Sequence, residues 1–196
     1  MLADLQFDPV SHRYTLGGRE VPSVTQLLQV LDQYEGVPPH VLEAAREFGV
    51  HVHLACELWD RGTLDEAALD PNLRLYLDGW RKFRGDTGFI PTHIEERVLH
   101  RPMRYAGTLD RLGTLRGRPA LVDIKSGMKP KSVGAQTAAY LEAWMLTTSS
   151  PRKRPTRYCV QLMPEDYRLH VLDDPADWPL FVSCRNVHQW KSHNAA

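Results

Sequence analysis

The sequence predicts an α/β (α+β) fold in which helices flank a central mixed β-sheet. Two observations indicate this class. Apolar residues recur with a period near 3.6 from about residue 38 to 88, and then with a period of two through three successive segments. A strand–helix–strand passage over residues 119–163 also allows a parallel crossover within one sheet. The chain of 196 residues is most simply a single domain, 1–196, with a core of ordinary size.

Residues 1–88 are expected to form an N-terminal hairpin and helical part of that domain. Residues 5–22 alternate apolar and polar side chains around Gly17-Gly18, which is typical of a β-hairpin. Ser23 then suits a helix N-cap, with Gln26 as its capping-box partner. Further helical segments are predicted, in chain order, from about Pro38 to Arg61, as one or two turns within residues 63–69, and from Pro71 to about Gly88.

The sheet is expected within residues 89–172, together with the helix that crosses it. Gly117 marks a turn, so the two strands that it joins are expected to pair antiparallel. The predicted elements are strands over 90–100, 104–115 and 119–125, a helix over about 132–146, and a hairpin of strands over 158–163 and 167–172. A C-terminal helix beginning near Pro175 makes up the last part, residues 173–196.

The composition is that of a soluble globular protein, with 42% apolar and 24% charged residues. No apolar run approaches the roughly 20 residues that span a bilayer, so no membrane contact is expected. The N-terminus has no basic segment before an apolar one, so no signal peptide is expected. The three cysteines, Cys56, Cys159 and Cys184, are widely spaced and odd in number. They indicate free thiols in a reducing compartment.

The charges are unevenly distributed along the chain, although the formal net charge is zero. The segment from Arg97 to Arg157 holds 13 Lys and Arg and three acidic residues, a net charge of +10. The remaining 11 basic and 21 acidic residues give −10. A basic segment of this kind is suited to binding a polyanion. The alternative is that basic surface residues cluster here by chance.

Two apolar runs within that basic segment each end in an aspartate, Asp110 and Asp123. If the two strands pair, both carboxylates can reach one Mg²⁺ ion, and the main-chain carbonyl of Ile124 is available as a third ligand. Lys125 leaves the strand on the same face as Asp123, where its ammonium can hold the attacking water or stabilise developing charge. Taken alone, Asp-x-Lys on a strand is usually a solvated ion pair. Lys129 and Lys131 follow on a loop that contains glycine and proline. Such a loop is suited to binding the backbone phosphates of a nucleic acid.

Other polar residues are candidates for the same site. Gln136 and Tyr140 are four apart on the helix that follows, so they share a face. His53 lies on the long N-terminal helix, where a histidine is more often structural than a ligand. Glu95 and Glu96 are alternatives for a third carboxylate, because neighbouring strand residues point to opposite faces.

In combination these residues resemble the PD-(D/E)XK nuclease superfamily, in particular its RecB-like exonuclease branch, which includes phage-type exonucleases and the mitochondrial genome maintenance exonuclease. Any one motif is weak, but five in the right order are specific. The matching motifs are Gly49 to His53, Glu95 with Glu96 as second choice, Gly107 to Asp110, Asp123 to Lys125 followed by Ser126-Gly127, and Gln136 to Tyr140. Ser23 and Thr25, in an N-terminal VPSVTQLL, are also similar to the opening of such phage proteins.

The resemblance implies a restriction-endonuclease-like core and a site that binds Mg²⁺ or Mn²⁺ through Asp110 and Asp123. It implies Lys125 as the catalytic lysine and His53 as a ligand or phosphate contact, with Gln136 and Tyr140 orienting the site or the DNA strand. We expect Lys125→Ala to abolish cleavage with little loss of stability. The residues expected to contact nucleic acid are Ser23, Thr25, Ser126, Lys129 and Lys131.

The same resemblance implies a metal-dependent DNA exonuclease that acts on single strands or DNA ends in replication, recombination or repair. It would work in the cytoplasm of a bacterial or phage-infected cell. No helicase motif is present, so a helicase or recombination protein that acts with it would be a separate chain. No iron–sulfur cluster is expected, because Cys159 and Cys184 lie too far apart in sequence. The alternatives are a non-catalytic nucleic-acid-binding module that retains the nuclease fold, and a structural or interaction protein with a fortuitous motif.

Overall fold

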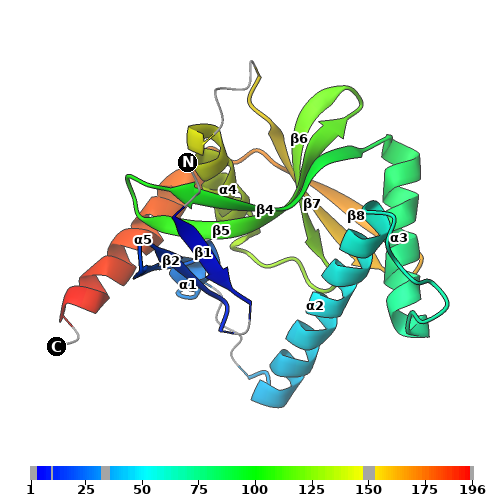
Figure 1. Ribbon diagram of the computed structural model, residues 1–196, viewed down its shortest axis with the longest axis horizontal. Helices are drawn as coiled ribbons and strands as arrows, with labels where there is room; N and C mark the ends of the chain where they lie inside the picture. Colours follow the sequence, from blue (N-terminus) through cyan, green and yellow to red (C-terminus); the bar gives the residue numbers. More distant parts are fainter. Residues whose placement is uncertain (1–3, 10, 32–35, 148–152, 195–196) are drawn as a thin grey trace.

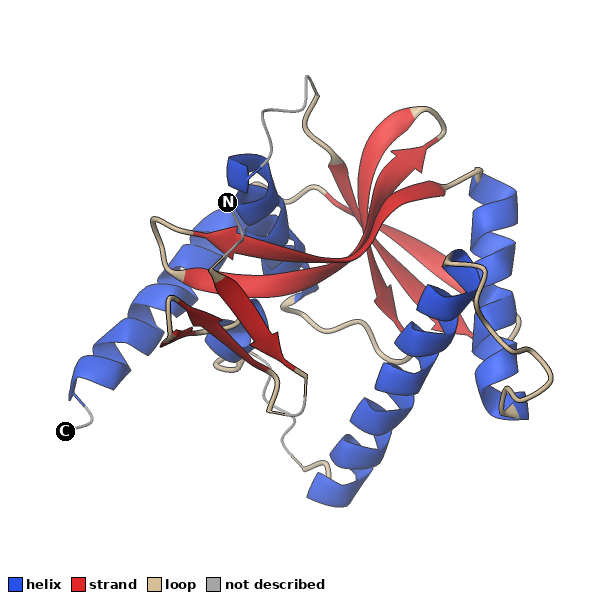
Figure 2. Cartoon of the chain, in the orientation of Figure 1, coloured by secondary structure: helices blue, strands red, loops and turns tan. Residues whose placement is uncertain are grey.

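The structure, a computed structural model, describes residues 4–9, 11–31, 36–147 and 153–194. It confirms the expected class: helices flank a five-stranded mixed sheet, and a small three-stranded antiparallel sheet lies beside it (Figure 1 and Figure 2). The large sheet has the order β4-β5-β6-β7-β8, with the bounds β4, Ile90–His100; β5, Tyr105–Leu115; β6, Arg118–Lys125; β7, Thr156–Met163; and β8, Asp166–Leu172. The helices are α1, Val24–Leu28; α2, Pro39–Asp60; α3, Pro71–Thr87; α4, Val133–Thr147; and α5, Asp177–Asn194.

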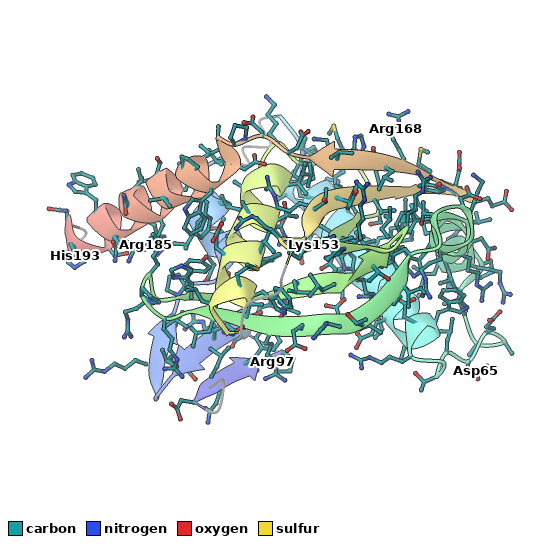
Figure 3. All side chains as sticks on the ribbon, turned by 90° about the horizontal axis from the view of Figure 1, so that it is seen from above. Asp65, Arg97, Lys153, Arg168, Arg185 and His193 are labelled. Atoms are coloured by element: carbon teal, nitrogen blue, oxygen red, sulfur yellow. The ribbon has the colours of Figure 1, made fainter. Side chains whose placement is uncertain are left out.

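The strand pairings follow the expected topology. Strands β4, β5 and β6 form an antiparallel meander, with Gly117 at φ 74° in the tight turn between β5 and β6. Helix α4 then crosses over to β7, which pairs parallel to β6 from Ala120↔Thr156 to Lys125↔Gln161. Strand β8 pairs antiparallel to β7. The crossover expected between residues 119 and 163 is therefore confirmed. Figure 3 marks the two edges of this sheet with Arg97 on β4 and Arg168 on β8.

Each face of the sheet has its own apolar core. Helix α4 packs against one face, with α1 and α5 behind it, around a cluster that includes Leu109, Leu121 and Phe181. Helices α2 and α3 cover the other face around a cluster that includes Trp80 and Val122. Helix α4 is buried nearly all round, because it lies between the sheet and α5, and its sequence is correspondingly apolar.

Two N-terminal details differ from the expectation. The predicted hairpin is a three-stranded meander of β1 (Leu5–Asp8), β2 (Arg13–Leu16) and β3 (Arg19–Val21), and the glycine turn joins only the last two strands. Residues 63–69 form turns and no helix. A physical reason is that the Asp65 side chain accepts a hydrogen bond from the Ala67 main-chain N–H at 3.0 Å, an Asx turn that competes with helix formation.

The predicted helix signals are otherwise confirmed. Ser23 Oγ accepts from Gln26 N at 3.1 Å, and Ser23 N donates to Gln26 Oε1 at 2.8 Å, which completes the capping box of α1. Gly88 ends α3 in the left-handed conformation, with φ 65°. None of the helices among the described residues has both the length and the apolar composition needed to cross a membrane.

Candidate metal centre

The candidate site lies where strands β5 and β6 separate. Their main-chain pairing begins at Arg111↔Val122 and does not continue to Ile124. Instead, Ile124 N donates to the Asp110 carboxylate, at 2.6 Å from Oδ2. Strand β6 stays paired to β7 as far as Lys125, so β5 is the strand that diverges. The divergence leaves the Asp110 side chain beside the main chain of Ile124. Ile124 lies near the end of β6, as expected, but Asp110 lies in the middle of β5 and not near its end.

Helix α2 brings His53 to the same point. Its Nε2 lies 2.8 Å from the carbonyl oxygen of Ile124, and its Nδ1 lies 3.7 Å from Asp110 Oδ2. Burial lowers the pKa of His53, although Asp110 opposes this, so the neutral ring is favoured. A carbonyl can only accept, so in the neutral ring Nε2 carries the proton and Nδ1 presents a lone pair towards Asp110. One turn earlier, a Cβ on Gly49 would lie 3.4 Å from Ser126 Oγ, so this helix passes close to the end of β6.

The third group is Glu95, which the structure selects over Glu96. Ligand atoms of His53, Glu95 and Asp110 all lie within 4.8 Å of one another. Glu95 has φ 51° inside β4, a left-handed conformation that costs a non-glycine residue about 1–3 kcal/mol and clusters at functional sites. Burial and the neighbouring Asp110 raise the pKa of Glu95 to about 8, against the influence of Arg111.

Asp123 and Lys125 form a buried ion pair next to this group. Lys125 Nζ lies 2.8 Å from Asp123 Oδ2 and 3.0 Å from Oδ1, and Asp123 is 1% exposed. Burial raises the pKa of Asp123 to about 7, which Lys125 opposes and Asp110 reinforces. Burial alone would lower the pKa of Lys125, but Asp123 and Asp110 together outweigh it and raise that pKa above its usual value. Asp123 pairs with Lys125 and is not one of the three residues of the group, so its predicted role as a metal ligand stays a prediction.

These donors fit a divalent cation. Carboxylate and carbonyl oxygens are the ligands that Mg²⁺ and Mn²⁺ prefer, and an imidazole nitrogen completes a mixed set. Burial, reinforced by Asp110, raises the pKa values of Glu95 and Asp123, so their charged forms are disfavoured without a further positive charge. A cation would supply that charge. The predicted ligands His53, Asp110 and the Ile124 carbonyl come together, and Glu95 joins them.

The predicted Gln-x-x-x-Tyr pair lies beside the acidic groups on α4. Gln136 Nε2 donates to the Tyr140 hydroxyl at 3.1 Å. Burial raises the pKa of Tyr140, and both Asp110 and Asp123 add to the effect, so the phenol is within electrostatic reach of both carboxylates. The glycine of the Gly-x-x-Asp motif has a steric role here. A Cβ on Gly107 would lie 2.5 Å from Tyr140 Cε1, so only glycine lets this ring lie across β5.

The residues predicted to contact nucleic acid have different environments. Ser23 is 4% exposed and uses its hydroxyl to cap α1, so its demonstrated role is structural. Thr25 is exposed, with its hydroxyl 3.0 Å from that of Ser23. Ser126 and Lys129 are partly exposed on the chain that leaves β6, and Lys131 is exposed. Their contact with DNA stays a prediction.

A buried charge network behind the site was not anticipated. Arg111 is fully buried, and its guanidinium bonds both Asp60 and Glu95 at 2.7 Å. Asp60 also accepts from Trp80 Nε1 at 3.1 Å and pairs with Arg84. Two signals could have revealed the network. Asp60 is seven residues after His53, on the same helix face, and Arg111 is a second charged residue, directly after Asp110, in a mostly apolar strand.

No known family model matches the chain, and no curated protein matches it. The function is therefore inferred from the geometry of the site and from its motifs.

Proposed function

We propose that the chain is a Mg²⁺- or Mn²⁺-dependent deoxyribonuclease that hydrolyses phosphodiester bonds. The observation that carries the proposal is the convergence of His53, Glu95 and Asp110 within 4.8 Å, beside the Ile124 carbonyl and the Asp123–Lys125 pair. Preference for single strands or DNA ends follows from the resemblance to RecB-like exonucleases.

The roles of the residues follow from their positions. His53, Asp110, Glu95 and the Ile124 carbonyl would hold the ion, which when bound polarises the phosphate and lowers the pKa of its water. Asp123 holds the Lys125 ammonium beside these groups, at 2.8 Å. From there Lys125 can orient a water molecule or stabilise charge on the phosphate. In the reaction the water oxygen bonds to phosphorus, a phosphorus–sugar oxygen bond breaks, and the leaving oxygen takes up a proton.

The charge available to hold DNA is smaller than the sequence suggests. Among the described residues, five basic residues of the segment from Arg97 to Arg157 pair with carboxylates of the same chain, namely Arg101, Arg111, Lys125, Arg154 and Arg157. Lys129 and Lys131 remain on the loop that follows the site. They are the lysines of this segment best placed to meet a phosphate next to the one being cleaved.

The test is digestion of 5′- and 3′-labelled single- and double-stranded DNA with Mg²⁺ or Mn²⁺. The wild-type protein is expected to degrade DNA only with a divalent ion. Asp110→Asn and Asp123→Asn are expected to remove this activity, while Glu96→Gln, beside the selected carboxylate, is expected to retain it. Each variant is first compared with the wild type by circular dichroism, so that loss of activity is not confused with loss of fold.

Three outcomes are distinct. Salt-sensitive DNA binding without cleavage would indicate the non-catalytic module, because phosphate contacts weaken steeply with salt. Absence of both binding and cleavage would contradict any nucleic-acid function. Equal digestion by the wild type and by Asp123→Asn would trace the activity to a contaminant and would overturn the proposal.

A further inference from the structure

Arg111 occupies a position that the proposed chemistry does not explain. It lies on β5 directly after Asp110, with its side chain on the α2 and α3 side of the sheet. Its Nη1 donates to Glu95 Oε1 and to the Asp110 main-chain carbonyl, each at 2.7 Å. Its Nε donates to Asp60 Oδ2 at 2.7 Å. One guanidinium thus joins two groups of the candidate centre to the end of helix α2.

The outer part of the network fixes Asp60 in turn. Asp60 Oδ1 accepts from Trp80 Nε1 at 3.1 Å and also pairs with Arg84. The guanidinium of Arg111 lies over the Trp80 ring, 5.8 Å from its centroid. The charges alternate from Arg84 through Asp60 and Arg111 to Glu95. Trp80 and Arg84 thus hold one oxygen of the Asp60 carboxylate, and the other oxygen accepts from Arg111.

Stability alone is a poor reason for this arrangement. Arg111 is 0% exposed, and its Nη2 has no hydrogen-bond partner among the described residues. A buried ion pair of this kind is often no more stable than well-packed apolar residues of the same volume. Glu95, which Arg111 contacts, holds a strained φ of 51° inside a strand. A local cost of this type is typical of functional sites, where surrounding groups hold a side chain in a set geometry.

We propose that Arg111, held by Asp60, is a positioning residue that fixes the Glu95 carboxylate towards the metal centre. The inference rests on the proposed function, since it concerns the same site. Arg111 takes one oxygen of Glu95, Oε1, and leaves the other for the cation. It also fixes the main chain at Asp110, so two ligands keep their relative position before the ion binds.

The experiment is a double-mutant cycle read by direct Mn²⁺ binding, by calorimetry or by electron paramagnetic resonance of free Mn²⁺. Arg111→Met is expected to raise the Mn²⁺ Kd about 10–100-fold, the range for residues that orient a metal ligand. In a Glu95→Gln background the same substitution is expected to change Kd much less than in the wild type, because most of its effect passes through the Glu95 carboxylate. Arg84→Met also removes an arginine from Asp60 but leaves the contact of Arg111 with Glu95, so it is expected to raise the Kd less than Arg111→Met does.

If Arg111→Met does not fold, Asp60→Asn provides the same comparison, because it loosens Arg111 and retains its charge. An equal loss of affinity in the wild-type and Glu95→Gln backgrounds would overturn the inference, as would unchanged affinity in Arg111→Met. In either case the wild type would still bind Mn²⁺ and cleave DNA, so the proposed function would stand. A wild type that neither binds Mn²⁺ nor cleaves DNA would overturn both.

Discussion

His53 Nε2 lies 2.8 Å from the carbonyl oxygen of Ile124, although 71 residues separate the two in the chain. This contact fixes helix α2 against the end of β6. It also assigns the proton of the neutral imidazole to Nε2, because the carbonyl has none to give. The other nitrogen, Nδ1, is then free to face Asp110 Oδ2 at 3.7 Å. Two electron-rich atoms at that distance favour a cation close to both.

The first prediction follows from this geometry. His53→Ala is expected to weaken Mn²⁺ binding by at least about 10-fold, since loss of a ligand should cost no less than loss of a residue that orients one. Titration calorimetry measures the change. His51→Ala is the control, because His51 is exposed on the same helix and lies outside the group of ligands. Equal affinities for the two variants would show that His53 does not bind the ion.

The second prediction concerns the Asp123–Lys125 pair. The motif alone suggests that Lys125 can be removed with little loss of stability, but the structure changes this expectation. Removing the lysine leaves Asp123 uncompensated at 1% exposure, and breaking a buried pair in this way costs about 3–5 kcal/mol. Lys125→Met is therefore expected to lose both DNA cleavage and stability to urea. The double variant with Asp123→Asn is expected to regain stability but not cleavage. A Lys125→Met protein as stable as the wild type would contradict the prediction.

The third prediction tests why the Gly-x-x-Asp motif begins with glycine. A Cβ on Gly107 would lie 2.5 Å from the Tyr140 ring, which is itself buried and bonded to Gln136. Gly107→Ala is expected to destabilise the protein by about 1–3 kcal/mol, the usual cost of overpacking. Thermal or urea unfolding measures it. Gly127→Ala, with nothing within 4 Å of the added Cβ, is expected to change stability by less than about 0.5 kcal/mol. Equal stabilities for the two variants would refute the steric argument.

Periodicity and capping residues were sufficient to predict the main elements of the fold. Apolar alternation located β4, β5 and β6, and the Ser23–Gln26 box located the start of α1. Residues 63–69 differ from the prediction because the Asp65 side chain accepts from the Ala67 main-chain N–H, a local competition with helix formation that apolar periodicity does not record.

For the site, sequence order predicted which residues come together better than it predicted how they interact. His53, Asp110 and Ile124 meet as expected, since each lies at the end or on the face of a predicted element. Two features could not be derived from periodicity. The positive φ of Glu95 breaks strand alternation, and the buried charge of Arg111 depends on Asp60 at the far end of another helix.

The last prediction concerns pH and a histidine away from the metal centre. His100 is 7% exposed, stacks on Tyr105 at 4.9 Å between ring centroids, and accepts a hydrogen bond from Met103 N at its Nδ1. Burial lowers its pKa below 6.5; Glu142 opposes this and Arg185 reinforces it. Protonation would also remove the acceptor that Met103 N uses, so the folded protein favours the neutral ring.

The sign follows from proton linkage. Below pH 6.5 the unfolded chain binds more protons at His100 than the folded protein does, so its contribution to stability is present above pH 6.5 and is lost as the pH falls towards the folded pKa. Each unit of pKa shift corresponds to about 1.4 kcal/mol.

Glu95 and Asp123, with raised pKa values, affect the pH dependence of stability in the opposite direction, so the comparison must be made between variants. Urea unfolding at pH 7.5 and 5.5 is expected to show a smaller acid-induced loss in His100→Asn, which keeps an acceptor for Met103 N, than in the wild type. The control is His51→Asn, on an exposed helix face, whose acid-induced loss of stability is expected to match that of the wild type. An equal loss in His100→Asn and the wild type would show that the pKa of His100 does not change on folding.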